Sequence, residues 1–549
     1  MILVYEFEYI SNNNFLENFL KNFAEKNKIE HYITKNKEKI SLHVKGSEDA
    51  LLAFSDELSN SLPFSIFLKS THVNAVDEWD SGKAVDIKKC EVYLPFTKEA
   101  LNRAKKDFNP FVKNETGLNF DINPPLFFTY NDKSVQYENS FQEAFLQAAD
   151  VIESGEKLNL KTLNGTFCIS KVKDTTYSDD TIIMPCDLSL VGKIAVMEDE
   201  EAAILASLEK PVVKAHVNLV FSSQYLNFPK FIKLRLASDL FLYFLSLALL
   251  EKGVKFVALE AEDDAAAASL GFGQEIKNSK WLEVCHLKSG QNIIIKGTVF
   301  TPPKLLNSIK PLKNPHHMQF AATIHELELF EEINCGIYLS RNHNDMIMLY
   351  SDKTGVLDIL QTDFEDSLDE MLERIKKEDE NGGKLLDKYN QSFSKIYENA
   401  KNIRFEVKNI STLWAAAAYL LGFGEDSQTA KKRLFENIEL FGGQKGVRVD
   451  YKLTDEKSLK TSLNAHKFLK SVISFKLAGA DDGLLSFGIA ESLIHFLNDF
   501  ADKVKDEFEV KNILLMGSLF GSKTVSNLCV NHISVNHKVY FNKELPIEL

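Results

Sequence analysis

Strand and helix periods follow one another through the first 75 residues of the chain. Residues 2–10 alternate between apolar and polar, and Phe15–Lys26 has apolar side chains at 15, 19, 20 and 23, the spacing of one helix face. Residues 40–44 alternate again, and residues 50–62 have a second helical pattern. This order predicts a split β-α-β module over residues 1–75.

Prolines divide the remainder of the chain. Residues 76–136 have little periodicity, which is typical of a linker or a small irregular unit, and contain Pro95, Pro110, Pro124 and Pro125. Alternating strand and helix patterns over residues 137–302 predict an α/β domain. Residues 303–549 begin with apolar strands near 336–339 and 346–350. The later part is mostly helical and includes a buried strand at 510–516 that enters a glycine-containing turn. We therefore expect a multidomain α+β and α/β protein.

Composition and charge exclude several classes of protein. The formal charge of −14 disfavours general nucleic-acid binding, and the six cysteines form no C-x-x-C pair, which excludes a structural zinc site of that kind. The most apolar stretch, residues 240–250, is about half of the ~20 residues that a membrane span needs, so it predicts a buried helix. The first residues alternate as a strand and have no basic region of a signal peptide. We expect a cytoplasmic protein without membrane insertion.

Two local patterns are candidates for chemistry. The run from Gly517 to Thr524 nearly forms a phosphate-binding loop, but Ser522 stands directly before Lys523, where such a loop requires glycine. We interpret it as a strand-to-helix turn with glycines for geometry. His316 and His317, with His325, are the best metal-ligand candidates, but their spacing lacks the i,i+4 pair of a helical site. We expect no metal site.

Several longer runs resemble one known family. The run from Gly155 to Phe167, which contains Lys161, is similar to the family pattern Gly-Lys-Ile-Val-Ala-x-Lys-Gly-x-Gly-Gly-Phe, and Lys193-Ile-Ala-Val-Met resembles Lys-Pro-x-Ala-Val-Met. Residues 432–436 resemble Gly-Arg-Leu-Phe-Asp, and residues 516–520 resemble Ser-Gly-Gly-Val-Phe. Together these runs resemble the HypF family of multidomain carbamoyltransferases, which help to build the cyanide ligands of nickel-iron hydrogenases, and in particular a shortened, degenerate type of that family.

The resemblance implies a domain order. Residues 1–75 would form an acylphosphatase-like (ferredoxin-like) domain, and residues 76–136 a shortened linker in place of the family's zinc fingers. Residues 137–302 would form a YrdC-like α/β domain. Residues 303–549 would form a reduced TsaD-like domain of the actin type.

The same comparison shows departures at each of the family's active centres. Leu16 stands where the acylphosphatase loop has its arginine, and Cys90 is the single cysteine of the zinc-finger segment. The nucleotide loop Thr-Ser-Gly-Asn corresponds to residues 259–262, which include two glutamates. The family's histidine-rich metal motif corresponds to residues 409–413, which contain no histidine, or in part to His316 and His317. The sequence also ends before the family's Asn-Asp-Gly-Gly segment.

These departures, with the resemblance, imply an accessory protein of nickel-iron hydrogenase maturation or assembly. It would have lost catalysis, would need no cofactor, and would bind a hydrogenase subunit precursor or a maturation protein. Lys161, Lys193, Gly517 and Lys523 are then remnants of nucleotide sites, and no residue is assigned a catalytic role. The alternative is a divergent ATP-dependent carbamoyltransferase that uses ATP and Mg²⁺ at these residues. A third hypothesis, an RNA-binding surface on the YrdC-like domain, is disfavoured by the acidic charge.

Overall fold

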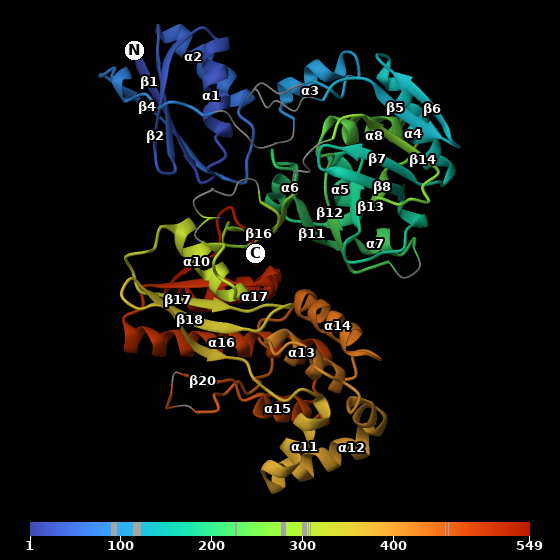
Figure 1. The fold of residues 1–549 in the computed structure, drawn as a ribbon, viewed down its shortest axis with the longest axis vertical. Helices are drawn as coiled ribbons and strands as arrows, with labels where there is room; N and C mark the ends of the chain where they lie inside the picture. The colour runs from blue at the N-terminus through green and yellow to red at the C-terminus, as the bar shows by residue number, and fades with distance from the viewer. Residues whose placement is uncertain are drawn as a thin grey trace. The chain divides into compact units, whose positions relative to one another are not determined.

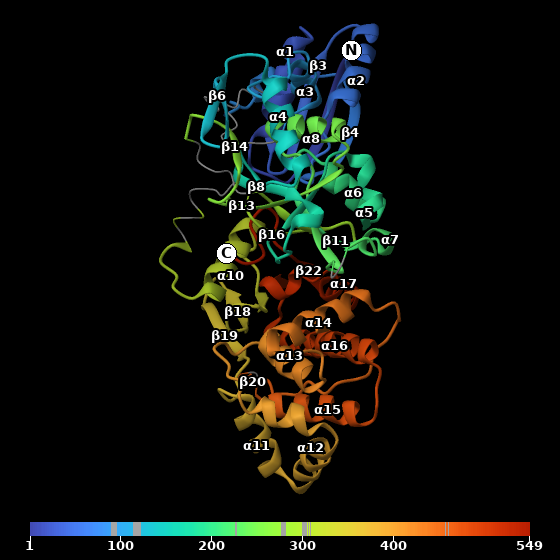
Figure 2. The ribbon, with the colours of Figure 1, turned by 90° about the vertical axis from the view of Figure 1, so that its right-hand side faces the viewer.

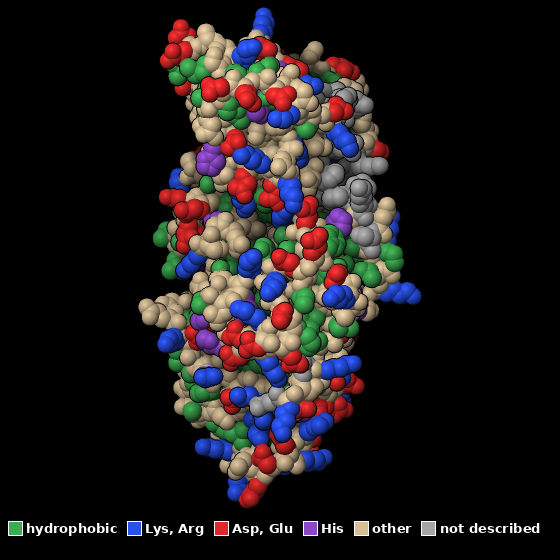
Figure 3. Space-filling view, turned by 90° about the vertical axis from the view of Figure 1, so that its left-hand side faces the viewer, with side chains coloured by type: hydrophobic (Ala, Val, Ile, Leu, Met, Phe, Trp, Pro, Cys, Tyr) green, Lys and Arg blue, Asp and Glu red, His purple; other side chains and the backbone are tan. Residues whose placement is uncertain are grey.

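The computed structural model describes residues 1–88, 96–112, 122–225, 228–275, 281–298, 305, 307, 309–455, 457–458 and 460–549. The chain divides into two compact units. The first comprises residues 1–284 and 297–300, and the second comprises residues 285–296 and 301–549. On the face seen in Figure 3, acidic and basic side chains are interspersed.

The first unit begins with a four-stranded sheet. Its strands pair in the order β2-β3-β1-β4, and β1 is antiparallel to both neighbours. Helices α1 and α2 cover one face (Figure 1), where Phe23 packs edge to face against Phe54 with ring centroids 5.3 Å apart. This arrangement confirms the predicted split β-α-β module. Its elements are β1 (Ile2–Tyr9), α1 (Phe15–Lys26), β2 (Glu30–Asn36), β3 (Lys39–Lys45), α2 (Glu48–Ser61) and β4 (Leu68–Val76).

A second, mixed sheet forms the remainder of the first unit. Its order is β15-β11-β12-β9-β13-β8-β7-β14-β5-β6, and the short strand β10 pairs with β11. The strands are β5 (Leu126–Tyr130), β6 (Lys133–Tyr137), β7 (Leu158–Thr162), β8 (Gly165–Lys171), β9 (Ile182–Pro185), β10 (Ala195–Val196), β11 (Val212–Val217), β12 (Phe231–Leu234), β13 (Phe256–Ala261), β14 (Ala268–Phe272) and β15 (Glu283–His286). The segment expected to be a linker thus contributes β5 and most of β6 to this sheet.

Six helices belong to the described residues of this part of the chain, in addition to short 3₁₀ turns. They are α3 (Lys98–Lys105), α4 (Phe141–Ser154), α5 (Val191–Ile194), α6 (Asp199–Ala206), α7 (Leu219–Ser222) and α8 (Leu240–Glu251). Helix α8 packs against α4 and is largely buried, which confirms the helix predicted at residues 240–250. Among the described residues, no helix is both long and apolar enough to span a membrane.

A buried carboxylate begins α8. Asp239 is fully buried and caps the helix: its Oδ1 accepts the N–H of Leu242 at 3.0 Å, and its Oδ2 accepts the N–H of Leu163 at 2.8 Å. Burial raises the pKa of this carboxyl group. One side chain therefore joins the first turn of the most apolar helix to the loop that follows β7.

The second unit has a six-stranded sheet in the order β20-β19-β18-β17-β21-β22. Strands β17, β21 and β22 are parallel to one another, whereas β17, β18 and β19 are antiparallel neighbours. The strands are β17 (Asn334–Tyr338), β18 (Met346–Ser351), β19 (Gly355–Gln361), β20 (Thr461–Ser462), β21 (Asn512–Met516) and β22 (Lys538–Tyr540). A further strand, β16 (Asn292–Lys296), also belongs to this unit.

Helices cover both faces of this sheet (Figure 1). Phe320 and Ile324 of α10 pack with Leu514 on one face, and the largest core cluster, around Trp414 and Phe468, lies on the other. The helices are α10 (Pro315–Leu327), α11 (Leu368–Glu378), α12 (Glu380–Ala400), α13 (Ile410–Leu420), α14 (Ser427–Leu440), α15 (Ala465–Leu477), α16 (Asp482–Phe508) and α17 (Lys523–Ile533). Because β17 and β21 are parallel neighbours, the turns that follow them lie at the same edge of the sheet.

Replacing Asp239 by alanine tests the cap. The change leaves two buried N–H groups without an acceptor, which costs about 1–3 kcal/mol for each group. We expect faster hydrogen exchange of the amides at the start of α8 and after β7, measured by mass spectrometry. The Asp239→Asn variant keeps one oxygen acceptor and should change less; equal exchange in the alanine variant and the parent would contradict the assignment.

Candidate functional sites

The turn after β21 has the strand-turn-helix form that the sequence predicts. Gly517 adopts φ +98°, and a Cβ there would lie 2.2 Å from the carbonyl oxygen of Leu339. Glycine is therefore required by backbone conformation and by close approach to the neighbouring chain. Lys523 is the first residue of α17 and is half-buried, and Ser522 caps that helix.

Two carboxylates accept hydrogen bonds from the donors of this turn. The N–H of Ser518 donates to Glu548 Oε2 at 2.6 Å. The hydroxyl of Ser522 donates to Glu439 Oε1 at 2.5 Å, and the N–H of Thr524 donates to Glu439 Oε2 at 3.2 Å. Donors of this kind, in a loop leading into a helix, bind phosphate oxygens in nucleotide-binding proteins. Here the chain supplies its own anionic acceptors.

The turn after β17 also donates a hydrogen bond to the Glu548 carboxylate. Ser340 donates its hydroxyl to Glu548 Oε1 at 2.8 Å, and its N–H donates to Asp345 Oδ1 at 2.8 Å. Asp345 Oδ2 accepts the N–H of Ile410. Burial raises the pKa of Asp345 to about 8. The edge of the sheet where β17 and β21 end is thus lined by acceptors that belong to the chain.

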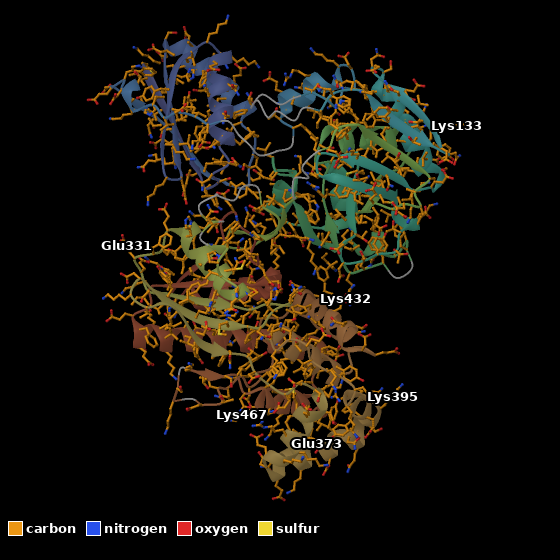
Figure 4. All side chains as sticks on the ribbon, viewed as in Figure 1. Lys133, Glu331, Glu373, Lys395, Lys432 and Lys467 are labelled. Atoms are coloured by element: carbon orange, nitrogen blue, oxygen red, sulfur yellow. The ribbon has the colours of Figure 1, made fainter. Side chains whose placement is uncertain are left out.

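Cationic groups stand beside this edge. The guanidinium carbon of Arg341 lies 4.4 Å from the centroid of the Phe435 ring. Burial, with Arg341 nearby, lowers the pKa of Lys431 to about 8. The next residue, Lys432, belongs to the Gly-Arg-Leu-Phe-Asp-like run and is exposed on α14 (Figure 4). No local motif marks four residues of this edge, so they were not predicted from the sequence: Arg341, Lys431, Glu439 and Glu548.

The structure places the two candidate lysines of residues 137–302, Lys161 and Lys193, in different surroundings. Lys161 lies on β7 with its Nζ 5.1 Å from the centroid of the Phe272 ring. Lys193 is exposed on α5 and lines a pocket whose lining does not include Lys161. A nucleotide site that uses both lysines remains a prediction.

Acidic side chains in the segment aligned with the nucleotide loop have partners of their own. Glu260 of β13 accepts the hydroxyl of Thr181 at 3.1 Å. Asp263 follows the strand, and its Oδ2 pairs with Lys157 Nζ at 2.7 Å. This ion pair lowers the pKa of Asp263, so the carboxylate stays charged at neutral pH. A triphosphate at this place would meet like charge.

The loop after β1 also makes hydrogen bonds within the chain. Asn13 Oδ1 accepts the N–H of Phe15 at 2.9 Å and the hydroxyl of Tyr9 at 3.2 Å. Leu16 is buried in the core, and Lys35 Nζ pairs with Glu17 Oε1 at 2.6 Å. The side chain in the position of the family's arginine is therefore part of the core.

The histidine candidates are only partly brought together. His317 Nε2 lies 2.7 Å from Asp358 Oδ1, and these two residues with His316 offer ligand atoms within 4.8 Å of one another. Burial lowers the pKa of His316, which favours the neutral imidazole that metals bind. His325 is not part of this cluster; its ring lies 5.6 Å from that of Phe330. These three residues could hold a divalent ion if it replaced the His317–Asp358 pair.

Asp358 was missed because it lies on β19, far from the histidines in sequence. The zinc-finger candidate Cys90 lies outside the described residues. The cysteines that the structure describes, Cys168, Cys186, Cys285, Cys335 and Cys529, are free thiols.

Removing the two carboxylates from the turn after β21 should expose a phosphate site. In the Glu439→Ala/Glu548→Ala variant, Ser518 and Thr524 present unpaired N–H groups to a space cleared of negative charge. We expect inorganic phosphate at millimolar concentration to raise the melting temperature of this variant and to leave the parent unchanged. The Glu439→Gln/Glu548→Gln variant keeps the volume and should stay insensitive. A parent that is stabilised by phosphate would contradict the interpretation.

Asp345 should make stability depend on pH. Its folded-state pKa of about 8 exceeds the unfolded value of about 4, so the folded chain retains this proton to higher pH. Through this group the free energy of unfolding falls as pH rises from about 4 to about 8. We expect the melting temperature of the parent, relative to Asp345→Asn, to fall across that range. Parallel curves in a pH series of thermal unfolding would refute the assignment.

Comparisons with known proteins agree with this architecture. No family model matches the chain. Protein HydE of Wolinella succinogenes is 25% identical over 529 residues, which cover 92% of this chain and 91% of that protein. A crystal structure of full-length HypF in a phosphate- and nucleotide-bound form aligns with a TM-score of 0.66 and 13% identity, covering 100% of this chain and 96% of that one.

A second solved structure, HypF of T. kodakarensis, aligns with a TM-score of 0.70 and 11% identity, covering 99% of this chain and 96% of that one. These matches confirm the predicted multidomain α+β and α/β fold. The order of acylphosphatase-like, YrdC-like and TsaD-like domains stays a prediction. The fold of the chain is HypF-like over its whole length, and its sequence is similar to that of protein HydE.

Proposed function

We propose that this protein is an accessory factor in the maturation or assembly of nickel-iron hydrogenase. It has lost the catalysis of its HypF relatives and acts in the cytoplasm by binding a hydrogenase subunit precursor or a maturation protein. One observation carries the proposal: in a HypF-like fold, Glu439 and Glu548 occupy the donors of the turn after β21.

A phosphate would compete with Glu439 and Glu548 for those donors. A hydrogen bond from a neutral donor to a charged acceptor contributes about 1.5–3 kcal/mol, and such bonds to Glu548 and Glu439 are already formed within the folded chain. A phosphate would have to displace both carboxylates, or bind beside them against like charge. Either requirement opposes nucleotide binding at this edge of the sheet.

The other regions support the same proposal. Asn13 accepts hydrogen bonds within the loop after β1, and Glu260 and Asp263 surround the end of β13 with acidic groups. None of these arrangements prevents the domains from folding, because each one adds hydrogen bonds inside a domain. A fold that keeps its surfaces but closes its anion sites is suited to holding another protein.

The proposal is tested by incubating the purified chain with ATP, Mg²⁺ and carbamoyl phosphate. We expect no carbamoyl-phosphate-dependent release of pyrophosphate, beside an intact HypF as the positive control. Release that disappears in Lys161→Ala or Lys193→Ala would overturn the proposal and support the alternative, a divergent ATP-dependent carbamoyltransferase.

A genetic measurement tests the accessory role itself. In a host with nickel-iron hydrogenase, loss of this gene should lower the yield of mature hydrogenase, and the Lys161→Ala/Lys523→Ala variant should restore it as well as the parent does. Undiminished hydrogenase in the deletion strain would contradict the role.

A further inference from the structure

A pocket of about 980 Å³ lies in the first unit, between the end of α8 and the segments that contain α5 and α7. Its lining contains five lysines and one acidic residue, which is unusual in a chain with a net charge of −14. The lysines are Lys171, Lys173, Lys193, Lys252 and Lys255, and the acidic residue is Glu153. Figure 2 shows α5 and α7 next to each other at this part of the unit.

Several of these lysines are available to a ligand. Lys252 pairs with Asp150, and Lys171 donates to the backbone carbonyl of Glu153. Lys173, Lys193 and Lys255 are exposed, and their ammonium groups have no ion-pair or hydrogen-bond partner in the part of the chain that the structure describes. The pocket therefore presents uncompensated positive charge.

Apolar groups accompany this charge. Phe221 and Phe256 line the pocket, with ring centroids 5.1 Å apart and an interplanar angle of 74°. Val220, also in the lining, is 73% exposed, and its neighbour Leu219 is 76% exposed. Two adjacent aliphatic side chains left so open form a surface that a small inorganic anion would not cover.

We propose that this pocket binds an acidic segment of a partner protein that also carries an apolar side chain. Lysines spread over several elements favour carboxylates distributed along a peptide, and the aliphatic rim favours an apolar anchor beside them. The volume is near the upper end of small-molecule sites, about 300–1,000 Å³, and accommodates several peptide side chains. This inference rests on the proposed function and names the chemistry of the partner.

The pocket is separate from the segment aligned with the family's nucleotide loop. Residues 255 and 256 line it at the start of β13, whereas Glu260 lies near the other end of that strand. In the antiparallel pairing with β8, Val257 lies opposite Lys171 and Glu260 lies opposite Cys168. The proposed ligand and a nucleotide at Glu260 would therefore occupy different ends of the strand.

The probe is a library of random dodecapeptides displayed on phage, selected against the full chain. We expect enrichment of sequences that combine Asp and Glu with Leu, Ile or Phe. Fluorescence anisotropy of one selected peptide should show binding that weakens about tenfold or more in Lys173→Glu/Lys255→Glu, since two attractive pairs become repulsive. The Leu219→Ser/Val220→Ser variant should weaken it as well.

The matched control reverses the same amount of charge elsewhere. Lys133 on β6 and Lys395 on α12 are exposed (Figure 4) and lie outside the pocket, so Lys133→Glu/Lys395→Glu should bind like the parent. Selection without acidic enrichment, or equal loss of binding in the two charge-reversed variants, would overturn the inference. Displacement of the peptide by pyrophosphate or ATP at low micromolar concentration would also overturn it and indicate a small-anion site.

The outcomes separate this inference from the proposed function. Pyrophosphate release from ATP would contradict the proposed loss of catalysis, but it would leave a lysine-dependent peptide site intact. A catalytically silent chain without lysine-dependent peptide binding would retain the proposed function and lose this surface.

Discussion

The second unit depends on how the donors at one edge of its sheet are satisfied. Parallel strands β17 and β21 end side by side, and the turns after them present N–H and hydroxyl groups at that edge. Buried donors without acceptors are costly, so either a ligand or the chain must supply the oxygens. Glu439, Glu548 and Asp345 supply them here. In the proposed function, the same bonds that hold this edge together also close it to phosphate.

The proposed replacement of a bound ligand by side chains separates the fold from the activity. The HypF-like scaffold needs the strand-turn-helix geometry, and Gly517 provides it whether or not a nucleotide binds. In the first unit, Asn13 and the Lys35–Glu17 pair stabilise the loop after β1 in a comparable way. In the proposed function, each anion site of the family is replaced by a local hydrogen-bond network, so the change costs the fold little.

The sequence was a good guide where the signal is local. Alternation and helical spacing predicted β1, α1 and the buried α8, and the apolar run before Gly517 predicted β21 and its turn. Leu16 in the position of an arginine already indicated that the loop after β1 lacks a cation. These features depend on neighbours within a few residues, which periodicity and motifs record.

Contacts between distant residues were not predictable in this way. Glu439 meets Ser522, Asp358 meets His317, and the pocket lysines come from three separate segments, because the fold brings these positions together. The strands β5 and β6 were also missed, since the prolines around them masked a short hairpin that the second sheet completes. Tertiary pairing, rather than local preference, decides such elements.

We expect the chain's own carboxylates, and not a nucleotide, to accept the hydrogen bonds from the donors after β21. Equilibrium dialysis of radiolabelled ATP with Mg²⁺ against the full chain measures this most directly, with an intact HypF in parallel. The account predicts no saturable binding to this chain at concentrations that fill the HypF control. Saturable binding of one ATP, lost when Lys523 is replaced by alanine, would contradict it.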